Sequence, residues 1–257
     1  MKTRQNLIDL LKPLLMQDER VLAVWEGGSA ATSQLDAFSD LDLMVVANKK
    51  DIESLFEVIE KQLDSNFGMK DRYRMPEPAW HGFSQCIYQF EKTEPWLYLD
   101  LCLLPKDLED RFTACDRHGV IEPWKDTIGF IDNRPTAEDA IERRAMTYYQ
   151  KAITGEFVLR LEIDKALRRE HVLDATHFLH SYLMRHLAPL LNLKHRKAKV
   201  DFGIRYAKQA YPIEDYTFIK SFFQAGTVAQ LRVVALTFFE RFETLKMQFE
   251  QYKTPAT

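Results

Sequence analysis

Asp40 and Asp42 stand one residue apart where an apolar run, residues 41–47, begins. Alternate residues of a β-strand face the same side, so a strand here would place both carboxylates on one face. Like charges on one face destabilise the fold unless something neutralises them. Mg²⁺ favours carboxylate oxygens and completes its shell with water and substrate phosphates. The pair therefore predicts a magnesium site, and the alternative for the pair alone is a solvated strand end.

A third carboxylate, Asp100, lies in the middle of a second apolar run, residues 96–104. The run alternates as a half-buried strand does, because leucines occupy positions 97, 99, 101 and 103. If this strand lies beside residues 41–47, Asp100 joins the other two acids. Three acids could hold one or two metal ions that clamp a triphosphate during an in-line displacement. Taken alone, Asp100 could instead be a salt-bridged acid or an acid at a strand edge.

The sequence Gly27-Gly28-Ser29 directly follows a short apolar run, residues 21–25. Two glycines after a strand indicate a tight turn with unusual backbone angles. The backbone N–H groups of Gly28 and Ser29 could point at phosphate oxygens, and Ser29 could add a hydroxyl donor. The simpler alternative is a turn without a ligand.

The order of these features resembles that of the DNA polymerase beta-like nucleotidyltransferases. A strand leads to Gly28-Ser29, a second strand carries Asp40-Leu41-Asp42, and a later strand carries Asp100. The whole chain is similar to the small antibiotic nucleotidyltransferases that adenylylate lincosamides and aminoglycosides. The resemblance implies that Asp40 and Asp42 bind magnesium, that Asp100 is a third ligand or the base toward the acceptor hydroxyl, and that Gly28-Ser29 holds the nucleotide phosphates. Many relatives have a basic residue soon after Gly-Ser, whereas Ala30-Ala31-Thr32 follows here.

The elements that must position these residues divide the chain in two. Before residue 133 we expect helices at 4–17 and 51–64, strands at 21–25, 41–47, 84–91 and 96–104, and no assigned element at 68–80. After it, helical patterns predict helices at 137–154, 155–169, 171–192, 200–210, 214–224 and 227–252. The predicted fold is α+β, with a small mixed β-sheet nucleotidyltransferase domain with flanking helices (1–133) and an all-α helical bundle domain (134–257).

In the helical half, Arg144, Tyr148 and Lys151 recur on neighbouring turns of the first expected helix. We predict that they contact the nucleotide, and the alternative is an exposed helix face. The basic run 194–199 is expected to be a solvated loop, although it could instead meet phosphates or an acidic partner. The tryptophans at 80, 96 and 124 are expected in the core, although one could stack on a base or on the acceptor.

The composition of the chain limits the kinds of binding partner that we expect. The formal net charge of −3 argues against a strong, sequence-independent grip on nucleic acid. The chain has no apolar run long enough to span a membrane, and its three cysteines lack metal-site or redox spacing, so a cytoplasmic protein with buried thiols is expected. The helical half could form a homodimer.

Two functions follow. In the first, the protein is an enzyme that moves a nucleoside monophosphate, AMP from ATP, to a hydroxyl of a small-molecule acceptor such as an antibiotic, and releases pyrophosphate. In the second, it is a non-catalytic nucleotide-binding protein or an antitoxin-like partner protein of the same fold. The presence of all three acids favours the enzyme.

Overall fold

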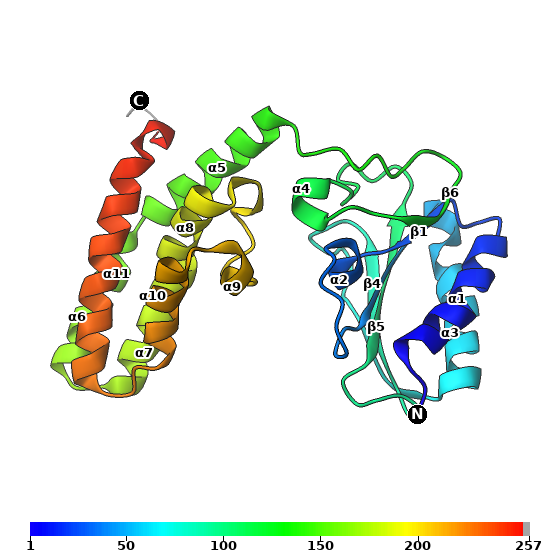
Figure 1. Ribbon diagram of the computed structural model, residues 1–257, viewed down its shortest axis with the longest axis horizontal. Coiled ribbons are helices and arrows are strands. Elements are labelled where there is room, and N and C mark those ends of the chain that lie inside the picture. Colours follow the sequence, from blue (N-terminus) through cyan, green and yellow to red (C-terminus); the bar gives the residue numbers. More distant parts are fainter. Residues whose placement is uncertain (254–257) are drawn as a thin grey trace. The chain divides into compact units, whose positions relative to one another are not determined.

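The computed structural model describes residues 1–253 and consists of two compact units (Figure 1). The first comprises Met1–Thr136 and the second begins at Ala137. The domain boundary expected at residue 133 remains a prediction.

The first unit is built on a six-stranded sheet with strand order β3-β4-β5-β2-β1-β6. Its strands are β1 (Ala23–Glu26), β2 (Leu41–Ala47), β3 (Met69–Arg74), β4 (Ser84–Phe90), β5 (Tyr98–Pro105) and β6 (Pro123–Asp126). Strands β2 and β5 are parallel, and the other neighbouring pairs are antiparallel. The sheet is therefore mixed, and with the helices described next it confirms the predicted α+β fold.

Helices α1 (Arg4–Gln17) and α3 (Ile52–Phe67) cover one face of the sheet (Figure 1). Their apolar stripes pack against alternate residues of the central strands, and this core contains Leu41, Leu43, Leu99 and Leu101. Because side chains alternate along a strand, the residues between these leucines face the opposite side of the sheet. Asp42 and Asp100 are among them.

The opposite face carries a smaller core that includes Trp25, Val46, Cys102 and Phe130. Two short helices, α2 (Gly28–Ala31) and α4 (Cys115–His118), belong to the loops of this unit. Ala31, the last residue of α2, packs into this smaller core. The turn after β1 is therefore anchored on the same face as Asp42 and Asp100.

The second unit is helical around one core. Its helices are α5 (Glu138–Ile153), α6 (Glu156–Arg168), α7 (Val172–Tyr182), α8 (Ala188–His195), α9 (Ala207–Ala210), α10 (Ile213–Phe223) and α11 (Val228–Gln248). The longest, α11, contacts α6 and α7 and begins at a capping box between Thr227 and Gln230.

The expected helix at 171–192 is interrupted. A π-helical turn, Leu183–Leu187, separates α7 from α8. Proline has no backbone N–H and its ring crowds the preceding turn, so Pro189 denies the Arg185 carbonyl its usual partner four residues on. The wider turn before Pro189 accommodates this loss.

The expected helix at 200–210 is wrong except for α9. Gly203 and Tyr206 have φ angles of +57° and +59°, which end any right-handed helix. The carbonyls of Val200 and Gly203 instead accept hydrogen bonds from the side-chain amide of Asn192, at 3.1 and 2.9 Å.

Two strands were not predicted. β3 is mostly exposed and carries charged residues on both faces, so it lacks an alternating pattern. β6 has four residues and begins at a proline, which a strand tolerates at the edge of a sheet. The expected burial of the tryptophans is also wrong for two of them, because Trp80 is 87% exposed and Trp96 is 47% exposed.

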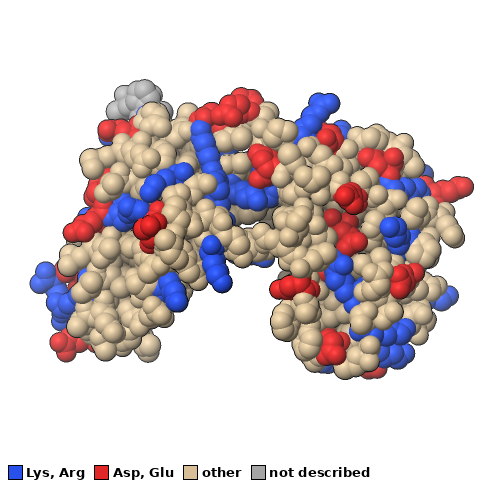
Figure 2. Space-filling view, viewed as in Figure 1, with Lys and Arg blue, Asp and Glu red and all other residues tan. Residues whose placement is uncertain are grey.

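Acidic and basic side chains are interspersed over the visible face of the first unit (Figure 2). This mixture agrees with the small net charge of −3. In residues 1–253, none of the helices has the length and apolar character that crossing a membrane requires.

Candidate active site

Asp42 and Asp100 are direct neighbours in the centre of the sheet. The parallel pairing of β2 and β5 places Asp42 opposite Asp100, with Leu41 opposite Leu99 and Leu43 opposite Leu101. Since the leucines face α1 and α3, both carboxylates lie on the other face. The adjacency expected for these two strands is therefore present.

The glycine turn closes over Asp42. The N–H of Gly27 donates to the carbonyl of Asp42 at 2.9 Å, which continues the β1–β2 pairing beyond Glu26. Gly28 has a φ of +51°, and a Cβ at this position would lie 1.7 Å from a carboxylate oxygen of Asp42. Only glycine allows this backbone angle and this approach together.

Within α2, Ser29 is half-buried, and its carbonyl accepts from the N–H of Gln34 at 2.9 Å. Across residues 1–253, no hydrogen bond from the N–H of Ser29 is present. This N–H lies one residue from the contact between Gly28 and Asp42, so an anion bound there would lie close to the acids.

Asp40 directly precedes β2 and is held through both its backbone and its side chain. The Nε of Arg4 donates to the carbonyl of Asp40 at 2.8 Å, and the same guanidinium forms an ion pair with Glu26. The interaction of the Tyr98 hydroxyl with the Asp40 carboxylate, together with burial, raises the pKa of Tyr98. Arg4 therefore links the ends of β1 and β2.

Asp100 is positioned by Gln85 of β4, whose Nε2 donates to both carboxylate oxygens at 2.8 and 2.9 Å. The thiol of Cys102 lies 3.6 Å from one of these oxygens. Burial raises the pKa of Asp100, and the Asp40 charge acts in the same direction, whereas the bonds from Gln85 and Cys102 oppose the rise. The charge of Asp40, which directly precedes β2, therefore affects Asp100 in β5.

His81 is 8% exposed and stacks on Phe83 at 3.6 Å between ring centroids. Burial lowers the pKa of His81, and the charge of Asp100 opposes this shift. The ring of His81 is therefore neutral near pH 7 and lies near Asp100.

The carboxylates of Asp40, Asp42 and Asp100 offer oxygen ligands of the kind that Mg²⁺ prefers. Nowhere in residues 1–253 do three His, Cys, Asp or Glu side chains form a ready-made metal-binding group. Mg²⁺ does not need one, because it is commonly bound by one or two carboxylates and takes its other ligands from water and substrate phosphates. The neighbouring carboxylates of Asp42 and Asp100, with Asp40 close enough to affect Asp100, fit that kind of site.

An exposed aromatic pair lies beside the acids in sequence. Phe38, two residues before Asp40, is 70% exposed, and its ring centroid is 5.7 Å from that of Trp96. The loop that carries Phe38 is ordered by Asp36, whose carboxylate accepts from the N–H of Phe38 at 2.9 Å. The pair therefore presents apolar surface to solvent from an ordered loop.

Arg144, Tyr148 and Lys151 lie on α5 in the helical unit. The Nζ of Lys151 lies 5.0 Å from the centroid of the Tyr148 ring. The Nη1 of Arg144 is buried and has no hydrogen-bond partner among the described residues. Their contact with a nucleotide remains a prediction.

Sequence reasoning missed Arg4, Gln85 and Tyr98 as site residues. Arg4 is far from the acids in sequence, and Gln85 reaches Asp100 only through the pairing of β4 with β5. Tyr98 carried a usable signal, since it shares a strand face with Asp100 in the alternating run.

A family model described as streptomycin adenylyltransferase matches residues 1–252. The chain therefore belongs to the streptomycin adenylyltransferase family and is a nucleotidyltransferase enzyme. This membership confirms the antibiotic nucleotidyltransferase resemblance expected from the sequence.

Three solved structures are similar at low identity. An aminoglycoside 6-adenyltransferase from Bacillus subtilis is 17% identical, with a TM-score of 0.36, over 99% of this chain and 94% of that one. A putative nucleotidyltransferase from H. pylori is 14% identical, with a TM-score of 0.31, over 95% of this chain and 98% of that one. A GLD-2/RNP-8 complex is 15% identical, with a TM-score of 0.29, over 39% of this chain and 34% of that one. At these TM-scores the likenesses carry no weight of their own. No curated protein sequence matches the chain significantly.

Proposed function

We propose that this enzyme transfers AMP from ATP to a hydroxyl of a small-molecule acceptor and releases pyrophosphate, in a magnesium-dependent reaction. The observation that carries the proposal is the pairing of Asp42 with Asp100 beneath the Gly28 turn. The name of the family supports an aminoglycoside antibiotic of the streptomycin kind as the acceptor.

Asp40 and Asp42 would hold the magnesium, with Asp100 as a third ligand or as the general base. A bound magnesium ion would neutralise charge on the phosphates as the transition state forms. The chain's own part is to hold the carboxylates in place, through Arg4 at Asp40 and Gln85 at Asp100.

The order of the strands suggests the direction of the reaction. Gly28 and Ser29 follow β1, on one side of β2, and Asp100 lies in β5 on the other side. The N–H and hydroxyl groups of Ser29 would bind the phosphates, so pyrophosphate would leave on the β1 side. In an in-line displacement the acceptor hydroxyl then attacks from the β5 side.

On that side, Asp100 would accept the proton of the acceptor hydroxyl as its oxygen bonds to the α-phosphorus and the bond to the pyrophosphate oxygen breaks. A carboxylate whose pKa is raised by burial is a better proton acceptor than a fully solvated one. The rings of Phe38 and Trp96, which stand next to Asp40 and β5, would pack against the acceptor.

The test is transfer from ATP labelled at the α-phosphate to a panel of aminoglycosides, with magnesium and with EDTA. We expect the aminoglycoside to become labelled only when magnesium is present. Release of labelled AMP to water with no labelled acceptor, or equal transfer in EDTA, would contradict it.

A further inference from the structure

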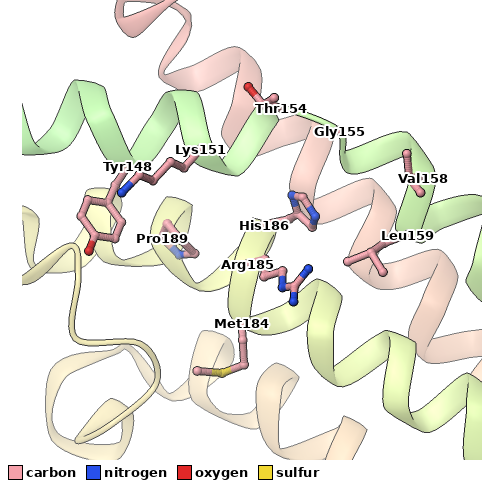
Figure 3. A pocket seen from close by; sticks show the side chains of 10 residues that line it. All are labelled: Tyr148, Lys151, Thr154, Gly155, Val158, Leu159, Met184, Arg185, His186 and Pro189. Carbon is pink, nitrogen blue, oxygen red and sulfur yellow. The ribbon is translucent and has the colours of Figure 1, made fainter. Parts of the chain in front are cut away.

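A cavity of about 480 Å³ opens within the helical unit, between α5, the start of α6 and the π-helical turn (Figure 3). Its volume is in the range of small-molecule sites, roughly 300–1,000 Å³. The walls are mainly apolar, and the polar groups at it are Tyr148, Lys151, Thr154, Arg185 and His186. None of the lining residues is acidic.

Two of these groups are cations that face solvent. Lys151 and Arg185 are exposed, and in residues 1–253 neither forms an ion pair. Their side chains reach the cavity from different elements, Lys151 from α5 and Arg185 from the π-helical turn (Figure 3). Two cations held at one opening without carboxylate partners favour an anionic ligand.

The N-terminus of helix α6 adds to the positive charge at the cavity. Gly155 precedes the 13-residue helix α6, with a left-handed φ of +69°, and lines the cavity with Thr154. The first amides of a helix lack partners within the helix and carry partial positive charge. The carboxylate of Glu156, in the first turn, is bonded to Tyr182 and Arg160, so it is already neutralised.

His186 supplies a buried polar atom. It is 5% exposed, and its Nδ1 hydrogen-bonds the carbonyl of Ala152 at 2.7 Å. Its Nε2 has no hydrogen-bond partner among the described residues, and its ring lines the cavity. With Nδ1 as the donor, a neutral ring keeps Nε2 as an acceptor for a ligand hydroxyl.

We propose that this cavity is a binding site for a phosphate-bearing small molecule, with Lys151, Arg185 and the start of α6 meeting the phosphate and His186 accepting from a hydroxyl. The phosphate could be that of the substrate nucleotide, which rests on the proposed function, or that of a separate metabolite. Arg185 and His186 come from the turn that Pro189 widens, so this irregularity shapes the site.

The test uses the full chain and inorganic tripolyphosphate in EDTA, measured by calorimetry. Without a divalent cation the acids of the first unit repel this anion, so binding reports on the cavity. The double variant Lys151→Ala/Arg185→Ala is expected to bind about 100-fold more weakly, since a hydrogen bond to a charged group contributes about tenfold or more. The matched control is Arg169→Ala/Lys208→Ala, which removes two exposed cations of the same unit outside the cavity.

The proposal is overturned if the wild type does not bind tripolyphosphate, or if control and double variant lose affinity equally while both keep the wild-type melting temperature. If the double variant melts lower, the single variant Arg185→Gln replaces it in this comparison. A second arm measures KM for ATP with magnesium. A higher KM for ATP in the double variant identifies the substrate nucleotide as the ligand. An unchanged KM for ATP, together with lost tripolyphosphate binding, identifies a separate phosphorylated molecule.

Binding to Asp42→Asn separates this inference from the proposed function. The cavity predicts unchanged tripolyphosphate affinity in that variant, whatever happens to transfer. Loss of binding in Asp42→Asn with retention in the double variant would place the anion in the first unit and refute the proposal.

Discussion

The carboxylate of Asp42 occupies the space that a Cβ at residue 28 would need, because such an atom would lie 1.7 Å from a carboxylate oxygen and 2.6 Å from its carbon. The glycine turn and the acid therefore form one unit of structure. The close approach fixes where Asp42 stands relative to the N–H groups of α2.

Gly28→Ala should consequently impair transfer far more than it impairs folding. The methyl group must displace Asp42, and a displacement of about 1 Å in a reacting site can cost about 100-fold in rate. The positive φ adds a stability cost of about 1–2 kcal/mol. The measurements are kcat/KM for transfer and the urea unfolding midpoint.

Gly226→Ala is the matched control, because a Cβ there meets nothing within 4 Å. We expect it to leave activity unchanged. Wild-type activity in Gly28→Ala would mean that the position of Asp42 does not matter to the reaction.

Arg4→Ala should lower kcat by about tenfold, because Arg4 holds the Asp40 carbonyl at 2.8 Å and a lost hydrogen bond to a charged group is worth about 1.5–3 kcal/mol. Arg72→Ala removes an arginine whose side chain is 61% exposed and which pairs with Glu60, so it should have little effect. Equal kcat losses in the two variants, measured by steady-state transfer, would argue against a positioning role for Arg4.

Trp96→Ala should raise KM for the acceptor by about tenfold and leave KM for ATP nearly unchanged, because a lost aromatic contact is worth about 1 kcal/mol or more. Tyr73→Ala is the control, as Tyr73 is also exposed but lies on β3 at the edge of the sheet. If KM for ATP rose and KM for the acceptor did not, the aromatic pair would belong to the nucleotide side.

Asp215 should make the stability of the helical unit sensitive to acid. It is 3% exposed and contacts His195 at 2.6 Å, Lys194 at 3.3 Å and Arg241. Burial alone would raise the pKa of Asp215, but the bonds from His195 and Arg241 outweigh it and lower the pKa. A lowered carboxyl pKa stabilises the fold above the unfolded pKa of about 3.9, and this contribution is lost as the pH falls through the folded pKa.

Asp215→Asn should therefore lose about 3 kcal/mol at pH 7, as expected when a buried charge loses its partner. It should also lose less stability than the wild type on acidification below about pH 4. Urea unfolding at pH 7 and pH 3.5 measures both effects. Asp174→Asn, which alters an exposed pair with His171, is the control. An acid dependence identical to that of the wild type would show that Asp215 does not carry it.

Individual helices and strands could be predicted from the sequence, whereas the pairing of strands that are distant in sequence could not. The helix at 4–17 and the strand at 41–47 follow from short apolar periodicities, and α1 and β2 have these bounds. The pairing of Asp42 with Asp100 depends on β5 lying parallel to β2, which no local pattern dictates. Gln85 depends in turn on β4 lying beside β5.

In the helical unit, periodicity predicted helices through Pro189 and through residues 200–206. The structure replaces the first with a π-helical turn. It replaces the second with turns whose carbonyls accept hydrogen bonds from the side chains of Asn192 in α8 and of Arg196, directly after α8. Both departures depend on single residues, Pro189 and Gly203, whose backbone requirements override an apolar pattern.

The most direct test of the account compares transfer from α-labelled ATP to an aminoglycoside by the wild type, Asp42→Asn and Asp107→Asn. Asp107 is an exposed aspartate just after β5, so its variant controls for loss of a charge. We predict that Asp42→Asn, folded as judged by its melting temperature, loses transfer by about 100- to 1,000-fold, as removal of a charge-stabilising group does. We predict that Asp107→Asn retains it. Transfer by Asp42→Asn at the wild-type rate would contradict the account.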